Sequence, residues 1–220
     1  MLETTVEIYW TDLDEEGVDL GRFADMLADD ERDRARRFRF ERDRRRYVVR
    51  RGRLRQLLSR HLGNTPSQVR LRAGPFGKPC LAEGDLRFSL SHSHGIALYA
   101  IVRGLEVGCD IEHRNGLLAY GQVANRLFSS CEARTLSSLP AAQQAEAFFN
   151  CWTRKEAYVK ARGLGLSLPL DSFDVSLAPS ESAALLRGCD GWSVQAFEPV
   201  PLYHAAVVAQ GDDWRLAVLS

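Results

Sequence analysis

Two carboxylates near the middle of the chain have the spacing that places both on one face of a strand. In the segment VGCDIE, residues 107–112, Asp110 and Glu112 alternate with apolar side chains. On a strand the two acids lie about 7 Å apart and face away from the apolar set. Neighbouring carboxylates repel each other, and a hard divalent cation removes that cost. Taken alone, such a pair is more often a solvated strand face, and a metal site is the alternative that the other motifs must support.

A third acid and a lysine follow on a predicted helix. In WTRKEAYVK, residues 152–160, Trp152, Glu156 and Lys160 recur every four residues and share one helix face. A Glu four residues before a Lys is most often an exposed pair, but Trp152 on the same face indicates partial burial. A carboxylate in this place can complete a magnesium shell, with Lys160 beside it for a phosphate.

A row of serines ends in a histidine in the segment FSLSHSHG, residues 88–95. Alternation puts Ser89, Ser91 and Ser93 on one side of a strand, with His92 at its end. A serine hydrolase is rejected, because Ser91 and His92 are sequence neighbours and no G-x-S-x-G elbow exists. Hydroxyls and an imidazole at a strand end favour anion binding, with a structural turn as the alternative.

Lysine is rare in this chain. Only Lys78, Lys155 and Lys160 are lysines among 29 basic residues. A compact ammonium can hold a phosphate oxygen in a narrow pocket where a planar guanidinium cannot, so we expect lysine to mark phosphate contacts, with chance as the alternative. Lys78 lies in Gly77-Lys78-Pro79, a rigid turn that is too short for a Walker A loop.

Charge is balanced overall but not locally. Residues 31–60 hold fourteen arginines against four acids, whereas residues 1–30 hold ten acids and one arginine. A helix predicted from about Asp43 to His61 places Arg46, Arg50 and Arg53 on one face and ends at Gly63. This segment concentrates positive charge for an anionic ligand.

The remaining pattern predicts an α+β fold rather than a doubly wound parallel sheet, because helices and strands come in blocks. The best boundary lies at Arg103-Gly104, with an N-terminal half of residues 1–104 and a C-terminal half of residues 105–220 that carries the metal site. The first predicted helix follows the capping residues 28–30 and ends at Arg37. The other predicted helices cover residues 43–61, 117–127, 130–139 and 141–162. The predicted strands are 5–10, 68–72, 86–91, 96–102, 107–112, 172–177, 192–197, 203–210 and 214–219.

Composition excludes several classes of protein. No apolar run approaches the roughly 20 residues of a membrane helix, so no membrane partner is expected. The first residues lack the order of a secretory signal, and the five cysteines form no CxxC pair. These features predict a cytoplasmic protein without disulfides or zinc.

The order of the motifs resembles one family closely. GKP (77–79), FSLSHS (88–93), VGCDIE (107–112), LFSSCE (127–132) and FNCWTRKEAYVKARGLGLSLPLDSF (149–173) are similar to the motifs of 4′-phosphopantetheinyl transferases of the surfactin-synthetase-activating type. The resemblance implies transfer of the 4′-phosphopantetheine arm of coenzyme A to a serine of an acyl or peptidyl carrier protein. Adenosine 3′,5′-bisphosphate is the other product. The resemblance also implies a monomer of two similar α+β halves, related by a pseudo-twofold axis, with coenzyme A in the cleft between them.

The resemblance also assigns residues to the reaction. Asp110, Glu112 and Glu156 would hold Mg²⁺ on the pyrophosphate, and Lys160 would contact the same phosphates. Glu156, Lys160 and Asp110 form the expected catalytic set, and either Glu156 or a metal-bound water would accept the serine proton. Glu132 matches a family glutamate near the carrier side, without a settled role.

The remaining assignments concern the adenosine end of coenzyme A. Lys78 and Gly77 would lie against the adenosine, and Ser91, His92, Arg34 and Arg46 would reach the 3′-phosphate. The chain departs from the family pattern at Tyr47, where Thr is common, at Glu31, where some members carry Lys, and at Cys109, which replaces Ile or Val.

Two alternatives from other classes stay open. An RNA-binding module could be built on the arginines of residues 31–60, although acids are interleaved with them and no row of aromatic residues accompanies them. Another magnesium-dependent phosphotransferase or phosphodiesterase could use the same carboxylates without a carrier protein.

Overall fold

The computed structural model describes residues 4–114 and 120–219. The first part of the chain forms these elements: β1 (Thr4–Asp12), α1 (Leu20–Asp25), α2 (Asp29–Arg36), α3 (Glu41–Leu62), β2 (Leu71–Ala73), β3 (Pro79–Leu81), β4 (Leu86–Ser93) and β5 (Ile96–Arg103). The second part forms these: β6 (Val107–His113), α4 (Tyr120–Leu127), α5 (Ser130–Ser138), α6 (Ala141–Arg162), β7 (Trp192–Phe197), β8 (Tyr203–Gln210) and β9 (Trp214–Leu219).

Two small sheets carry the fold, one built mainly from the first part of the chain and the other from the second part. Their strand orders are β4-β5-β1-β9 and β6-β8-β7, and β2 with β3 forms a separate hairpin. In both sheets the first strand pairs antiparallel with the second strand of a hairpin, β1 with β5 and β6 with β8. The predicted α+β class is confirmed, and both halves run strand, helices, hairpin. The pseudo-twofold axis and the boundary between residues 104 and 105 stay predictions. The last strand, β9, pairs in parallel with β1 in the N-terminal sheet.

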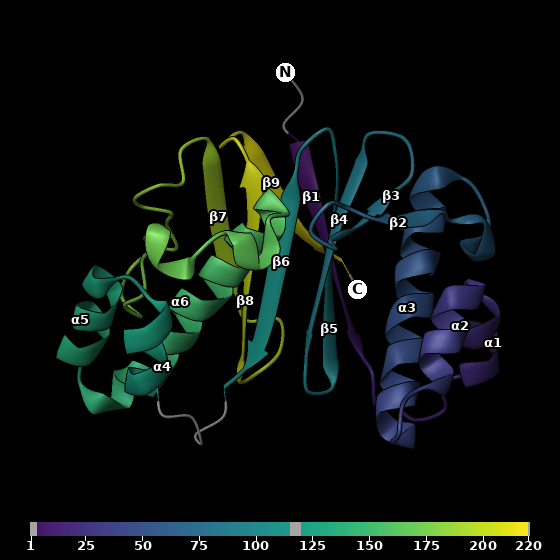
Figure 1. The fold of residues 1–220 in the computed structure, drawn as a ribbon, viewed down its shortest axis with the longest axis horizontal. Helices are drawn as coiled ribbons and strands as arrows, with labels where there is room; N and C mark the ends of the chain where they lie inside the picture. Colours follow the sequence, from purple (N-terminus) through teal and green to yellow (C-terminus); the bar gives the residue numbers. More distant parts are fainter. Residues whose placement is uncertain (1–3, 115–119, 220) are drawn as a thin grey trace.

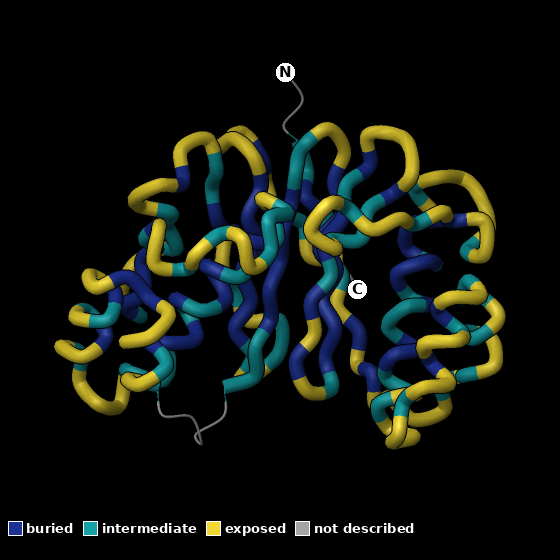
Figure 2. Tube along the Cα trace, in the orientation of Figure 1, coloured by how far each residue is buried: buried dark blue, intermediate teal, exposed yellow. Residues whose placement is uncertain are grey.

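The two sheets lie next to each other in the centre, with α1–α3 on one outer side and α4–α6 on the other (Figure 1). A buried apolar cluster joins them, with Ile8 and Leu98 from one sheet and Cys109 and Val207 from the other. Separate apolar clusters lie beneath α3 and beneath α6. The central strands are accordingly the most deeply buried part of the chain (Figure 2).

The long helices α3 and α6 frame these layers. Each has 22 residues and ends at a glycine in the left-handed region, Gly63 at φ 67° and Gly163 at φ 65°. Both helices agree with the sequence prediction, and the apolar face predicted for α3, including Leu54 and Leu58, is buried. A glycine at this position satisfies the last carbonyls without steric cost.

The strand predicted over residues 172–177 is wrong. Residues 170–172 form a 3₁₀ turn, and only Val175 makes an isolated bridge, to Leu185. The backbone here is held by side chains instead, since Val175 N donates to Glu132 Oε1 at 2.8 Å and Arg154 donates to Ser176 O at 2.5 Å.

Smaller differences concern element boundaries. The strand predicted from residue 68 begins at Leu71, because Pro66–Gln68 forms a 3₁₀ turn. The helix predicted from Leu117 is observed from Tyr120, and its first residues lie outside those described. Sequence patterns did not indicate α1 or β3. No helix in the described part of the chain is long and apolar enough to cross a membrane.

Candidate active site

Strand β6 packs directly against helix α6, and a glycine makes this possible. A Cβ at Gly108 would lie 2.1 Å from Ala157 O and 2.2 Å from Ala161 N. Any side chain there would force the strand off the helix. The close approach brings Asp110, two residues along β6, within 2.6 Å of Lys160 Nζ on α6.

Asp110 is buried and its two oxygens have different surroundings. Oδ1 accepts hydrogen bonds from Lys160 Nζ at 2.6 Å and from Ser91 Oγ at 2.7 Å. Lys160 Nζ also donates to Ser91 Oγ at 2.9 Å, which closes a triangle of polar groups. Oδ2 is buried and has no hydrogen-bond partner in the described structure. A buried carboxylate oxygen without a partner is costly and calls for a ligand.

Glu112 and Glu156 face the same region and feel the charge of Asp110. Burial, and then the Asp110 carboxylate, raise the pKa of both glutamates above the ordinary 4.5. Hydrogen bonds from Ser93 and Trp152 partly offset the effect at Glu112. Burial opposes the charge of Lys160, but the Asp110 carboxylate outweighs it and raises the pKa of the lysine. The three acids therefore carry more negative charge than one ammonium balances.

These groups line one end of a cavity of about 560 Å³, called here the polar cavity. The opposite end is basic, with Arg34, Arg50 and Arg51 from α2 and α3. The full lining is Asp30, Glu31, Arg34, Tyr47, Arg50, Arg51, Gly77, Pro79, Leu90, Ser91, His92, Asp110, Glu112, Trp152, Glu156 and Lys160.

Arg50 and Arg51 are basic residues of this cavity that the sequence assignment missed. Burial lowers the pKa of Arg50 to about 10, and the neighbouring charges of Arg51 and Arg34 contribute to the shift. The guanidinium lies 5.7 Å from the ring centroid of Tyr47, and that of Arg34 lies 5.6 Å from the same ring. Tyr47, a departure from the family pattern, thus forms a platform for two arginines. The signal was present in the predicted face of Arg46, Arg50 and Arg53.

Glu31, the second departure, is neutralised within the protein. Its buried carboxylate accepts from Arg51 Nε at 2.8 Å and from Arg55 Nε at 2.5 Å, and Ala28 N donates to it at 3.0 Å. Burial alone would raise the pKa of Glu31, but the two arginines and the Ala28 amide lower it. Glu31 therefore ties α2 to α3 without adding net negative charge to the basic end.

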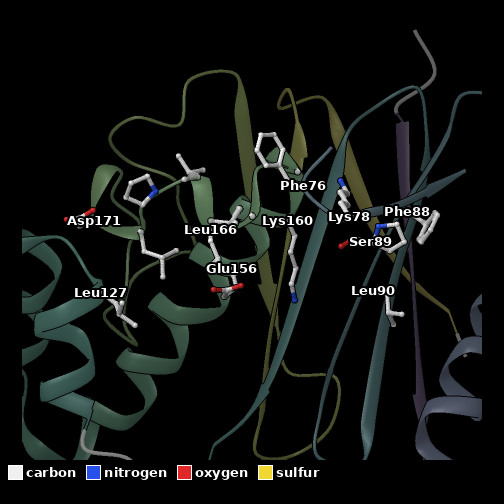
Figure 3. A pocket seen from close by; sticks show the side chains of 18 of the residues that line it. Phe76, Lys78, Phe88, Ser89, Leu90, Leu127, Glu156, Lys160, Leu166 and Asp171 are labelled. Carbon is white, nitrogen blue, oxygen red and sulfur yellow. The ribbon is translucent and has the colours of Figure 1, made fainter. Parts of the chain in front are cut away.

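A second cavity of about 590 Å³ adjoins the polar one and has mostly apolar walls. In Figure 3, Glu156 and Lys160 of α6 lie near the centre of the view, and the apolar residues Phe76, Leu127 and Leu166 lie around them. Leu166 is fully exposed and Phe76 is about half exposed, at 52%. This apolar cavity shares Glu156 and Lys160 with the polar cavity.

The expectation that lysines mark phosphate contacts is wrong for Lys155. Its ammonium is fully buried, pairs with Glu132 at 2.8 Å and donates to Leu170 O and Phe173 O at 2.6 Å. A compact ammonium suits an interior site with several acceptors around it. Glu132, which accepts from Ser129 N and Val175 N as well, belongs to this buried pair and lines neither cavity.

The Lys78 ammonium is also bound to the protein. It donates to Val107 O at 2.9 Å and Ala161 O at 3.4 Å, and lies 3.5 Å from Glu106. These bonds fasten the 74–79 turn to the C-terminal half. Lys78 lines the apolar cavity rather than the polar one.

The other predicted residues divide into those at the polar cavity and one that is not. Gly77, Ser91, His92 and Arg34 line it. Arg46 does not line either cavity, because its guanidinium forms an ion pair with Asp14.

The donors at the acidic end fit a hard divalent cation in kind. Asp110, Glu112 and Glu156 offer only oxygens, and one of these oxygens, Asp110 Oδ2, lacks a partner. Across residues 4–114 and 120–219, no three acid, histidine or cysteine side chains are grouped closely enough to form a metal site as they stand. Lys160, bound to Asp110 Oδ1, supplies positive charge at that place instead.

Comparison with known proteins gives consistent results along the chain. Residues 106–218 match the family model "4′-phosphopantetheinyl transferase superfamily", and residues 10–102 match the model "4′-phosphopantetheinyl transferase, N-terminal". The 4′-phosphopantetheinyl transferase HetI of Nostoc sp. is 36% identical over 98% of this chain and 92% of its own. The transferase Sfp of Bacillus subtilis is 30% identical over 88% and 86%, and the transferase AcpT of Salmonella typhimurium is 40% identical over 67% and 74%.

Proposed function

The chain belongs to the 4′-phosphopantetheinyl transferase superfamily, and we propose that its polar cavity is the place of the transfer. The substrate is coenzyme A, and the acceptor is a serine of an acyl or peptidyl carrier protein. The serine oxygen forms a bond to the β-phosphorus of coenzyme A, and the bond from that phosphorus to the bridging oxygen breaks. The electron pair leaves with adenosine 3′,5′-bisphosphate, and the serine proton passes to a base.

The observation that carries this proposal is the opposite charge of the two ends of the cavity. Coenzyme A has a pyrophosphate that contains the reacting bond and a separate 3′-phosphate on the ribose. An acidic end with an ammonium suits a cation-bound pyrophosphate, and a basic end suits a free phosphate group. Both ends line one space of about 560 Å³.

At the acidic end, Asp110, Glu112 and Glu156 would hold Mg²⁺. When bound, the cation neutralises negative charge on the pyrophosphate oxygens. Lys160 donates to the same phosphate group, and its ammonium is already held in place by Asp110 and Ser91. A donor held in position before the reaction costs no reorganisation when charge develops.

Glu156 is the proposed acceptor of the serine proton. Burial and the nearby Asp110 raise the pKa of Glu156 while no cation is bound, and the assignment of the base rests on the position of this residue. Its place on the wall shared by the polar and apolar cavities gives it access to a serine entering from the apolar side.

At the basic end, Arg34, Arg50 and His92 would bind the 3′-phosphate, and Arg51 is held by Glu31. We propose that Arg50 takes the part that the sequence assigned to Arg46. Ser91 would act by holding Asp110 and Lys160 rather than by touching the 3′-phosphate, because its hydroxyl is bonded to both. Gly77 and the backbone around Lys78 would lie against the adenosine.

The ion pairs of the arginine-rich segment disfavour the alternative of an RNA-binding surface. Seven of the fourteen arginines of residues 31–60 are paired within the protein: Arg32 with Asp29, Arg36 with Asp33, Arg42 with Asp43, Arg44 with Glu41, Arg46 with Asp14, and Arg51 and Arg55 with Glu31. Phosphate neutralisation along a nucleic acid needs cations that are free to pair with it. A monomeric state and a cytoplasmic location remain part of the proposal.

The test is the intact mass of an apo carrier protein after incubation with this protein, coenzyme A and Mg²⁺. We expect the carrier to gain the mass of phosphopantetheine, and the gain to disappear with EDTA. A carrier whose serine is replaced by alanine is the control and should gain nothing. Turnover of coenzyme A without any carrier would instead favour the other phosphotransferase, and a gain that persists in EDTA would contradict the metal site.

A further inference from the structure

Strands β4 and β6 lie close together but are not hydrogen-bonded neighbours in a sheet, since each belongs to a different one. The serine row of β4, Ser89, Ser91 and Ser93, bridges the gap. All three serines are buried, and each hydroxyl bonds to β6. Ser89 Oγ accepts from the backbone amide of Cys109 at 3.0 Å, and Ser91 Oγ donates to Asp110 at 2.7 Å.

Ser93 makes two bonds to β6 that restrict its hydroxyl. Its oxygen accepts a hydrogen bond from His113 N at 3.1 Å, and its O–H donates to Glu112 Oε2 at 2.7 Å. His94 Nδ1, at 3.4 Å, lies at the limit of hydrogen bonding. A hydroxyl has one proton, so the short bond to the carboxylate takes it and the backbone amide fixes the oxygen.

From this geometry we propose that Ser93 is a positioning residue, which holds the Glu112 carboxylate in the orientation that binds a divalent cation. The proposal rests on the metal site of the proposed function. Ser93 comes from the N-terminal half and Glu112 from the C-terminal half, so the acidic end is ordered from across the junction. No ion pair with Glu112 is found among the described residues, which leaves the hydrogen bonds from Ser93 and Trp152 to orient it.

Ser89 provides a matched control on the same strand face. It bridges the same two strands and is equally buried, but its partner is a backbone amide and not a carboxylate. A role in joining the halves is common to both serines. A role in orienting a metal ligand belongs to Ser93 and, through Asp110, to Ser91.

The experiment measures Mn²⁺ binding by the electron paramagnetic resonance signal of the free ion. Coenzyme A is present and carrier protein is left out, so that no turnover occurs. We expect Ser93→Ala to weaken Mn²⁺ binding about tenfold, the lower end of the effect of removing a partner of a metal ligand. Ser93→Thr keeps the hydroxyl and should restore most of the affinity, and Ser89→Ala should leave the affinity unchanged.

Thermal unfolding of each variant separates orientation from folding. Ser89→Ala and Ser93→Ala should lower the melting temperature by similar amounts, while only Ser93→Ala changes Mn²⁺ affinity. If Ser93→Ala does not fold, Ser93→Cys fills the same space with a much weaker donor and carries the same expectation.

Three results overturn the proposal. Unchanged Mn²⁺ affinity in Ser93→Ala, or an equal loss in Ser89→Ala, reduces Ser93 to a structural bridge. A wild-type protein that binds no Mn²⁺ in the presence of coenzyme A removes the metal site itself, and with it any role for Ser93 toward a metal. The carrier-mass experiment on the wild type distinguishes these results, because it tests the transfer and its metal requirement without any variant.

Discussion

Helices α3 and α6 have the same length and the same kind of C-terminal cap, but they present different charged groups to one cavity. α3 contributes Arg50 and Arg51, whereas α6 contributes Glu156 beside Lys160. The first strands of the two sheets also differ in charge. β6, which pairs with β8, carries the acid Asp110, whereas β1, which pairs with β5, has the apolar Ile8 at its centre. Both halves therefore have the same order of elements, and a few side chains make one end of the polar cavity acidic and the other basic.

The contrast also holds for the way each half handles its surplus charge. In the N-terminal half, seven of the fourteen arginines of residues 31–60 form ion pairs with acids, whereas Arg34 and Arg50, which line the polar cavity, have no acidic partner among the described ion pairs. In the C-terminal half, Lys160 balances only Asp110. At the polar cavity, Arg34 and Arg50 are left without an acidic partner at one end, and Glu112 and Glu156 without an ion pair at the other, among the described residues. A charged ligand therefore gains most there.

The largest expected effect is at the reacting end. Asp110→Asn keeps the shape of the side chain but removes the charge that holds Lys160 and would bind the cation. We expect kcat to fall about a thousandfold, as for the loss of one preorganised electrostatic group, with the fold retained. Intact-mass assays of carrier modification measure the rate. An Asp110→Asn variant with a near-normal rate would remove this residue from the reaction.

A substitution at Glu31 tests whether this acid of the N-terminal half contributes to stability rather than to the reaction. Glu31→Gln leaves Arg55, which is 2% exposed, without its charged partner. We expect the free energy of unfolding to fall by about 3 kcal/mol, the cost of leaving a buried charge unpaired. Glu41→Gln, which breaks an exposed pair with Arg44, is the control and should change stability by less than about 0.5 kcal/mol. Urea unfolding measures both, and equal effects would mean that burial does not decide the outcome.

Arg50 tests the binding end. Arg50→Met removes the guanidinium but keeps much of the apolar stem against Tyr47. We expect the KM for coenzyme A to rise about tenfold with kcat little changed, the loss of one charged hydrogen bond. Arg46→Met, one turn earlier on the same helix, is the matched control. A larger effect from Arg46→Met would restore the assignment made from the sequence.

The smallest expected effect is a pH dependence of stability at the acidic end. The pKa of Glu156 is raised in the folded protein, so the folded state keeps a proton that the unfolded chain has lost. Its contribution to stability is full below the ordinary 4.5 and falls as the pH rises through the folded pKa. Without metal, Glu156→Gln should therefore gain stability relative to the wild type as the pH rises across this window. Urea unfolding in EDTA at stepped pH measures the difference, and a difference that is constant with pH would contradict it.

The sequence predicted the elements well where local signals decide them. Gly63 and Gly163 end their helices as expected, and Gly108 together with the alternation of 107–112 places Asp110 on the face that meets α6. The predicted strand over 172–177 is wrong because contacts distant in the chain, from Glu132 and Arg154, hold its backbone. The alternating apolar side chains of this segment are buried although the segment does not form a strand of a sheet.

The site was predicted less evenly, for a similar reason. The motif residues Asp110, Glu112, Glu156 and Lys160 meet at one cavity, because each lies on a regular element whose faces can be deduced from spacing. The partners of the basic groups are set by tertiary contacts. Arg46 and Arg50 share one helix face, and only the position of Asp14 distinguishes them. Lys155 differs from Lys160 in the same way, since buried carbonyls and Glu132 surround it.

The central claim is that the two ends of the polar cavity divide the work, the acidic end reacting and the basic end binding the 3′-phosphate. The most direct measurement compares kcat/KM for coenzyme A and for 3′-dephospho-coenzyme A in the wild type, Arg50→Met and Glu156→Gln. We expect the wild type to prefer coenzyme A, Arg50→Met to lose much of that preference, and Glu156→Gln to keep it while both rates fall. A preference that survives in Arg50→Met but disappears in Glu156→Gln would contradict the division.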